Sequence, residues 1–144
     1  MLYESNNSFE TMEIAERLAQ NCSPGAIVCL SGDLGAGKTI FAKGFALGLG
    51  INAGITSPTF AIVNIYENEG AMPLYHFDVY RITSVSEMED TGFEDYFYGD
   101  GVCLVEWAEL IGELIPESAV WVEITKDLTV GEDYRKIEIK GKTI

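Results

Sequence analysis

Residues 30–41, LSGDLGAGKTIF, carry the strongest chemical signal in the sequence. Gly32, then four residues, then Gly37, Lys38 and Thr39 match the pattern G-x-x-x-x-G-K-[ST] of phosphate-binding loops. Glycines let the backbone point several N–H groups at a phosphate, at the positive end of the helix that begins there. The lysine reaches the β- and γ-phosphates of a nucleotide, and the threonine hydroxyl contacts its Mg²⁺. The motif therefore predicts a nucleotide site.

The segments on both sides of the motif fit this interpretation. Residues 26–31, AIVCLS, form a short apolar run that is typical of a strand covered on both faces. Residues 38–50 read as a largely buried helix that ends near Gly50. Strand, loop and helix are the order that phosphate binding requires, so a chance match is the weaker interpretation. The expected nucleotide contacts are Gly32, Asp33, Leu34, Gly35, Ala36, Gly37, Lys38 and Thr39.

A nucleotide site of this kind needs an acid at the end of a neighbouring strand to hold Mg²⁺, and three acids compete for that role. Asp78 follows LYHF, Glu106 follows VCLV, and Glu123 lies in AVWVEIT. Glu123 is the weakest candidate, because Ile124 continues an alternating strand beyond it. The strand-end pattern does not decide between the other two. Trp107 could cover a ligand or fill the core, and for the tryptophan alone the core is favoured.

Residues 76–81, HFDVYR, bring four kinds of functional side chain together. If the strand continues through them, His76, Asp78 and Tyr80 share one face. A single histidine in such a strand is more often a buried, hydrogen-bonded group than a ligand. Asp78 and Arg81 could equally form a structural ion pair.

Composition limits the class of protein. The chain has 144 residues, 47% of them hydrophobic and 22% charged, which fits one globular domain over residues 1–144. No apolar stretch is long enough to cross a membrane, and the N-terminus lacks a signal-peptide pattern, so we expect a cytoplasmic protein without membrane contact. The net charge is −14, with nine basic residues against 23 acids, which argues against tight direct binding of nucleic acid. The three cysteines form no C-x-x-C pair and are expected to be structural.

Strands alternate with helices in the rest of the sequence, and some strands form antiparallel pairs. This pattern predicts an α/β fold of the three-layer P-loop NTPase type, a mixed, mostly parallel sheet with helices on both sides and an antiparallel hairpin. The expected elements are a helix over 11–22 with Ser8 as its N-cap, a hairpin of strands 59–67 and 68–78 that turns at 68–70, a short helix from Ser84 with Glu87 at the capping-box spacing, a strand over 102–106, a helix over 107–115, and strands over 119–125 and 134–140.

Two classes of nucleotide-dependent protein fit the sequence less well. A GTPase would carry an N-K-x-D guanine motif, and the nearest string, TKDL, lacks the asparagine. A small-molecule kinase usually surrounds the transferred phosphoryl group with several arginines. This chain has three in all, Arg17, Arg81 and Arg135. A free-standing phosphotransferase that acts on a small metabolite nevertheless stays open as an alternative.

Four motifs in order carry a resemblance to a known family. GDLGAGKT at 32–39, TSPTF at 56–60, HFDVYR at 76–81 and VEWAE at 105–109 resemble the TsaE (YjeE) family, the bacterial P-loop ATPases of tRNA threonylcarbamoyladenosine biosynthesis. The resemblance covers essentially the whole chain. It implies a cytoplasmic, Mg²⁺-dependent ATPase, weak alone and stimulated by its partner proteins TsaB and TsaD.

The resemblance also implies roles for individual residues. Thr39 and Glu106 would contact Mg²⁺, Lys38 the phosphates, and Asp78 would position water or couple hydrolysis to the partner. Residues 56–60 would be switch-like, near the γ-phosphate and the partner surface. The remaining expected contacts are Trp107 beside the nucleotide, and Thr11 and Arg135 near the adenine.

Overall fold

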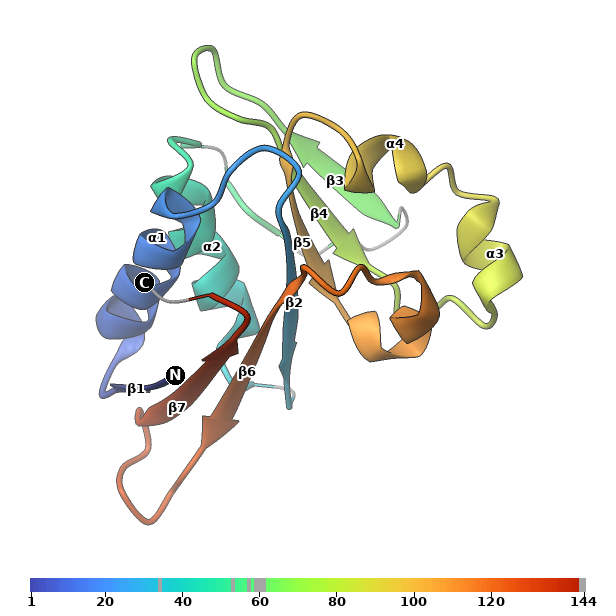
Figure 1. The fold of residues 1–144 in the computed structure, drawn as a ribbon. Coiled ribbons are helices and arrows are strands. Elements are labelled where there is room, and N and C mark those ends of the chain that lie inside the picture. The colour runs from blue at the N-terminus through green and yellow to red at the C-terminus, as the bar shows by residue number, and fades with distance from the viewer. Residues whose placement is uncertain (34, 53, 57, 59–61, 143–144) are drawn as a thin grey trace.

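The computed structural model describes residues 1–33, 35–52, 54–56, 58 and 62–142. Its strands form one seven-stranded sheet in the order β1-β7-β6-β2-β5-β4-β3 (Figure 1). The strands are β1 (Leu2–Ser5), β2 (Ile27–Gly32), β3 (Val63–Tyr66), β4 (Leu74–Asp78), β5 (Val102–Glu106), β6 (Val120–Lys126) and β7 (Arg135–Lys140). The helices are α1 (Ser8–Gln20), α2 (Lys38–Gly48), α3 (Val85–Glu89), α4 (Glu94–Phe97) and the 3₁₀ helix η1 (Ala108–Leu114).

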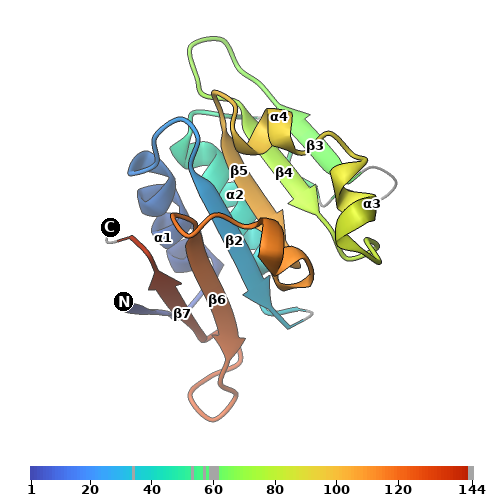
Figure 2. The ribbon, with the colours of Figure 1, turned by 45° about the vertical axis from the view of Figure 1, so that its right-hand side comes forward.

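The centre of the sheet is parallel and its edges are antiparallel. Strands β6, β2, β5 and β4 run parallel to one another, while β7 pairs antiparallel with β6 and β3 with β4. Helices α1 and α2 cover one face, and α3, α4 and η1 lie on the other (Figures 1 and 2). Each face buries its own apolar cluster. The predicted fold, a mixed α/β sheet between helices, is confirmed.

Several local predictions differ from the structure. The N-cap of α1 is Asn7 rather than Ser8, because the Asn7 side chain accepts a hydrogen bond from the Glu10 N–H. The helix expected over 107–115 is instead a 3₁₀ helix with a kink at Ile111. Neither β1 nor α4 was predicted, and each is only four residues long. β1 pairs with β7 from the other end of the chain, so its pairing is invisible to local patterns.

Other local predictions are confirmed. The side chain of Ser84 caps α3 by accepting from the Glu87 N–H. The hairpin of β3 and β4 forms with Gly70 in its turn at φ +81°, although residues 59–61 of the expected first strand lie outside the described residues. Within the described part of the chain, no helix is both long and apolar enough to cross a membrane.

The three cysteines are buried and free. Burial raises the pKa of Cys29 and of Cys103 to about 12, and it also raises the pKa of Cys22. A thiol with such a pKa is protonated at neutral pH and is a poor nucleophile or metal ligand. The structure therefore agrees with a packing role for these residues.

Helices α1 and α2 pack closely because α2 carries glycines where it meets α1. A Cβ added at Gly44 would overlap the backbone carbonyl oxygen of Met12, and one at Gly48 would overlap that of Glu16. This contact fixes α2, whose first residues, Lys38 and Thr39, belong to the phosphate-binding motif.

We expect Gly44→Ala to lower the free energy of unfolding by about 1–3 kcal/mol, because the new methyl group forces the two helices apart. Gly112→Ala is the matched control, since no atom lies within 4 Å of a Cβ added there. Urea unfolding of both variants measures the difference. If Gly44→Ala and the wild-type chain have the same free energy of unfolding, the close contact between α1 and α2 does not contribute to stability, and the prediction is wrong.

Candidate nucleotide-binding site

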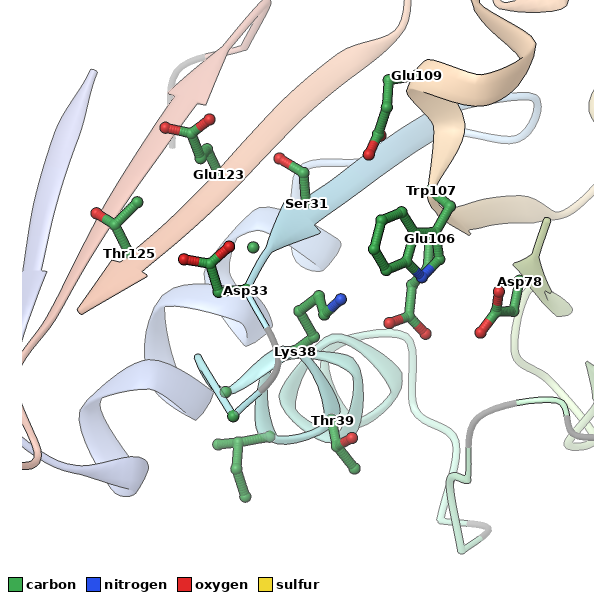
Figure 3. Close-up of a pocket in the computed structure, with 14 residues that line it drawn as sticks. Ser31, Asp33, Lys38, Thr39, Asp78, Glu106, Trp107, Glu109, Glu123 and Thr125 are labelled. Carbon is green, nitrogen blue, oxygen red and sulfur yellow. The ribbon is translucent and has the colours of Figure 1, made fainter. Parts of the chain in front are cut away.

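A cleft of about 660 Å³ opens at the carboxyl ends of the parallel strands, beside the start of α2. This is where ligands bind in open α/β sheets. The residues that line it come from the ends of β2, β4, β5 and β6, from the phosphate-binding loop and from η1 (Figure 3). They are Ser31, Gly32, Asp33, Gly35, Gly37, Lys38, Thr39, Ile40, Asp78, Glu106, Trp107, Glu109, Glu123 and Thr125.

The loop before α2 has the backbone of an anion site. Gly37 is the N-cap of α2 at φ +107°, a conformation that side chains rarely tolerate, and it offers no side chain to cap the helix. The first turn of α2 carries no acidic residue. At the start of the loop, a Cβ on Gly32 would lie 2.7 Å from the carbonyl oxygen of Ile124. Only glycine allows this loop to pass so close to β6, and the N–H groups at the start of α2 stay available for an anion.

Arg135 holds the outer side of the loop. Its Nε donates to the carbonyl oxygen of Ala36 (2.8 Å) and one guanidinium nitrogen donates to that of Gly35 (3.5 Å). The other guanidinium nitrogen donates to the carbonyls of Glu132 and Tyr134 in the hairpin of β6 and β7. Carbonyl oxygens that bond to Arg135 cannot turn toward a phosphate, so the arginine helps to keep the loop's N–H groups facing inward.

Lys38 projects into the cleft from the first position of α2. Its ammonium lies 4.8 Å from the centre of the Trp107 ring, and that ring packs at 4.8 Å against Tyr80. Trp107 has φ +64°, the one positive φ outside glycine among the described residues. Such a backbone is strained for a bulky side chain, and strain of this kind concentrates at functional sites. The turn after β5 thus directs the indole over the lysine (Figure 3).

The structure separates the three acids that the sequence left in competition. Asp78 and Glu106 end neighbouring parallel strands and are register partners, which puts both on the same side of the cleft as Trp107 (Figure 3). Glu123 also lines the cleft, but from β6, which continues through Lys126, and in Figure 3 it lies on the far side of Ser31. Glu106 is buried, with 5% of its surface exposed, whereas Glu123 is exposed.

His76 lies behind Glu106. The imidazole is buried, and its Nε2 is 2.7 Å from Glu106 Oε2. This agrees with the interpretation of His76 as a buried, hydrogen-bonded group.

Asp78 is not paired with Arg81 among the described residues, contrary to the alternative that the sequence allowed. Its Oδ1 accepts a hydrogen bond from the Tyr80 N–H (3.0 Å). The strand ends at Asp78, so Tyr80 does not continue the face of His76 and Asp78. Tyr80 is exposed instead, and its ring packs against that of Trp107.

Thr11 and Arg135 line a second, smaller cleft of about 150 Å³ on the other side of the loop. The two clefts share Gly35, Gly37 and Ile40. The hydroxyl of Thr11 is buried and lies 2.7 Å from that of Ser5, which ties α1 to β1. These two residues are thus near the loop but do not line the main cleft.

Parts of the predicted site lie outside the described residues. These are Leu34 of the loop and residues 57, 59 and 60 of the segment TSPTF. Thr56, which is described, bonds through its backbone to the Tyr66 hydroxyl and to the Asn64 side chain. The start of this segment is therefore attached to β3.

Sequence reasoning missed several cleft residues. Ser31 and Thr125 sit near the ends of β2 and β6, so a search of all parallel strand ends would have found them. Lys126 ends β6 with its ammonium over the loop, 3.2 Å from where a Cβ of Gly35 would be. Glu109 lines the cleft from η1, so a search of the strand ends would not have found it.

The charge of the cleft is unbalanced. Five carboxylates line it; they are Asp33, Asp78, Glu106, Glu109 and Glu123. Lys38 supplies the one ammonium among the lining residues, and the ammonium of Lys126 lies over the loop nearby. A polyanion would be repelled by these acids unless a cation entered with it. Oxygen ligands of this kind, together with the Thr39 hydroxyl, suit Mg²⁺. The residues present thus fit a nucleotide that is bound with Mg²⁺.

Comparisons with known proteins agree on one family. The family model described as Threonylcarbamoyl adenosine biosynthesis protein TsaE matches residues 5–137. The tRNA threonylcarbamoyladenosine biosynthesis protein TsaE of Bacillus subtilis is 50% identical over 131 residues, which are 91% of this chain and 79% of that protein. The protein of the same name from Haemophilus influenzae is 40% identical over 117 residues, 81% of this chain and 71% of that protein.

A solved structure is also similar to this chain. The crystal structure of Bacillus subtilis YdiB matches with a TM-score of 0.75 and 44% sequence identity, over 95% of this chain and 82% of that one. The family match spans the loop, both strand-end acids, β6 and the first three residues of β7. The chain therefore belongs to the TsaE family of threonylcarbamoyl adenosine biosynthesis proteins.

Proposed function

We propose that this chain binds and hydrolyses ATP with Mg²⁺ in the main cleft, as the ATPase subunit that acts on a TsaB–TsaD complex in tRNA threonylcarbamoyladenosine modification. The observation that carries the proposal is the start of α2, an uncapped helix end that places Lys38 and Thr39 in a cleft with two strand-end acids. Its backbone favours phosphate, its side chains suit Mg²⁺, and the family works in this pathway.

Each cleft residue has a chemical task in this proposal. Lys38 offsets the negative charge that builds up on the phosphates, and the N–H groups of the loop hold them in place. Mg²⁺ would supply further charge stabilisation, with Thr39 and Glu106 as the residues that hold it. Asp78 orients the attacking water, because its carboxylate stands at the cleft beside Glu106 and has no cation partner among the described residues.

The adenine would lie toward the smaller cleft. The loop separates the two clefts, and they share Gly35, Gly37 and Ile40, so a nucleotide whose phosphates occupy the loop can extend past it. Arg135 and Thr11 line that side. In this proposal Arg135 acts mainly on the loop, since its guanidinium already bonds to four backbone carbonyls.

The partners would be proteins rather than RNA. With nine basic residues against 23 acids, the chain has few groups to neutralise a phosphate backbone. An acidic ATPase subunit can instead act on a protein complex that itself binds the tRNA. Trp107 lines the cleft and packs against the exposed Tyr80, so a partner docked on Tyr80 would sense the nucleotide.

Hydrolysis of γ-labelled ATP tests this function. We expect slow release of inorganic phosphate by the chain alone, faster release with TsaB and TsaD, and no labelled metabolite. Transfer of the label to a small metabolite by the isolated chain would favour the alternative, a phosphotransferase. Absence of hydrolysis in the presence of both partners would contradict the proposal.

Glu106→Gln and Glu123→Gln separate the two acids. If Glu106 holds Mg²⁺, we expect Glu106→Gln to raise the Mg²⁺ concentration at the midpoint of ATP binding about tenfold, because a charged oxygen ligand becomes neutral. Glu123→Gln should respond to Mg²⁺ as the wild-type chain does, since it stands on the other side of Ser31 (Figure 3). Calorimetric ATP titrations at several Mg²⁺ concentrations measure both. The reverse pattern would assign the metal to Glu123.

A further inference from the structure

His76 is buried directly behind the carboxylate assigned above to Mg²⁺. It is 1% exposed, Glu106 is 5% exposed, and the two side chains meet at 2.7 Å. A carboxylate that contacts Mg²⁺ is ionised and can only accept hydrogen bonds, so in that state the imidazole Nε2–H donates to Glu106 Oε2. The bond is charge-assisted and short.

The parallel register of β4 and β5 creates this contact. His76 lies opposite Leu104, and Glu106 follows two residues later on the same face of the sheet. The imidazole therefore reaches diagonally along the sheet to Glu106 Oε2 from the core side. The other oxygen, Oε1, is left for the cleft that Glu106 lines.

Packing alone does not account for a histidine here. Leu74, two positions earlier on the same face, belongs to the apolar core under α1 and α2. Within the described part of the chain, His76 Nδ1 is buried without a hydrogen-bond partner, which costs free energy that an apolar side chain would avoid. What the ring contributes is the one bond to Glu106.

We propose that His76 is a positioning residue that holds the Glu106 carboxylate in the orientation needed to contact Mg²⁺. The inference rests on the proposed function, since it concerns the same metal. Partners behind a metal-binding carboxylate restrict its rotation, and their loss typically weakens metal affinity by about 10–100-fold. His76 should therefore affect Mg²⁺-dependent nucleotide binding and leave metal-free nucleotide binding unchanged.

Two variants that both carry a side-chain amide, and differ by one methylene group, test this role. The Nε2 atoms of glutamine and histidine are the same number of bonds from Cβ, so His76→Gln can still donate to Glu106. The amide of His76→Asn is one bond shorter and cannot. Calorimetric titration of ADP at increasing Mg²⁺ should give His76→Gln a Mg²⁺ midpoint near that of the wild-type chain and shift the midpoint of His76→Asn about tenfold upward. His76→Met, which lacks any donor, should shift it similarly.

Val105→Ala controls for a general loss of stability. Val105 is fully buried next to Glu106 in sequence, but on the opposite face of the sheet, so its truncation should lower the melting temperature without moving the Mg²⁺ midpoint. If the wild-type chain responds to Mg²⁺, and His76→Asn and His76→Met have the same Mg²⁺ midpoint as the wild-type chain, the positioning role alone is overturned. A wild-type chain that binds ADP equally with and without Mg²⁺ would overturn the proposed metal site itself.

The wild-type chain offers a test that needs no variant. His76 is the single histidine in the sequence, so its imidazole resonances can be assigned without ambiguity. We expect the Nε2 resonance to shift when Mg²⁺ is added to the ADP-bound chain, and the shift to disappear in Glu106→Gln. An unchanged resonance, when calorimetry shows that Mg²⁺ strengthens ADP binding, would overturn the proposal even if every His76 variant failed to fold.

Discussion

Lys38→Ala is expected to abolish ATP hydrolysis and to leave the fold intact. Loss of one charge-assisted contact costs about 1.5–3 kcal/mol of binding, or roughly 10–150-fold in ATP affinity. The loss in hydrolysis should be greater, because the ammonium stabilises charge that grows in the transition state. Lys38 is half-buried and contacts the Trp107 ring, so the free energy of unfolding should fall by only about 0.5–1 kcal/mol.

Lys43→Ala is the matched control for this prediction. Lys43 is on the same helix, is exposed, and does not line the main cleft, so its removal changes the net charge equally. Phosphate release with TsaB and TsaD, together with calorimetric ATP binding, measures both variants. Partner-stimulated turnover by Lys38→Ala at the wild-type rate would rule out the phosphate-binding role of the loop.

Asp78→Asn is expected to separate binding from hydrolysis. A group that orients water acts in the transition state, so ATP affinity should stay within about threefold while turnover falls roughly 100-fold or more. The amide should still accept from the Tyr80 N–H, because its oxygen can replace Oδ1. The turn after β4 therefore stays in place, and a loss of activity reports on the carboxylate.

Asp90→Asn provides the comparison, since Asp90 is an exposed acid at the end of α3, away from the cleft. Single-turnover hydrolysis and ATP titration of both variants give the two quantities. If Asp78→Asn hydrolyses ATP normally and only its melting temperature falls, Asp78 is a structural acid.

The features that depend on neighbouring residues were predictable from the sequence. The glycines, lysine and threonine of the loop lie within eight positions, and the apolar runs before and after them identify β2 and α2. The hairpin turn near Gly70 and the cap at Ser84 are likewise local. The expected fold class follows from these segments in order, and the structure confirms it.

The features that depend on pairing across the sheet were not predictable in the same way. Glu106 contacts His76 across 30 positions because β4 and β5 are parallel and in a particular register. Arg135 reaches the loop from about 100 positions away because β7 follows β6 beside β2. A strand-end pattern could name Asp78, Glu106 and Glu123 as candidates, but only the strand order puts the first two together.

The position of bound nucleotide tests the central claim most directly. A crystal structure of the chain with ADP and Mg²⁺ should show the phosphates at the N–H groups of residues 35–39, with Lys38 turned toward them, and Mg²⁺ between Thr39 and Glu106. Binding of ADP at another surface, with the loop and Glu106 free of ligand, would contradict the account.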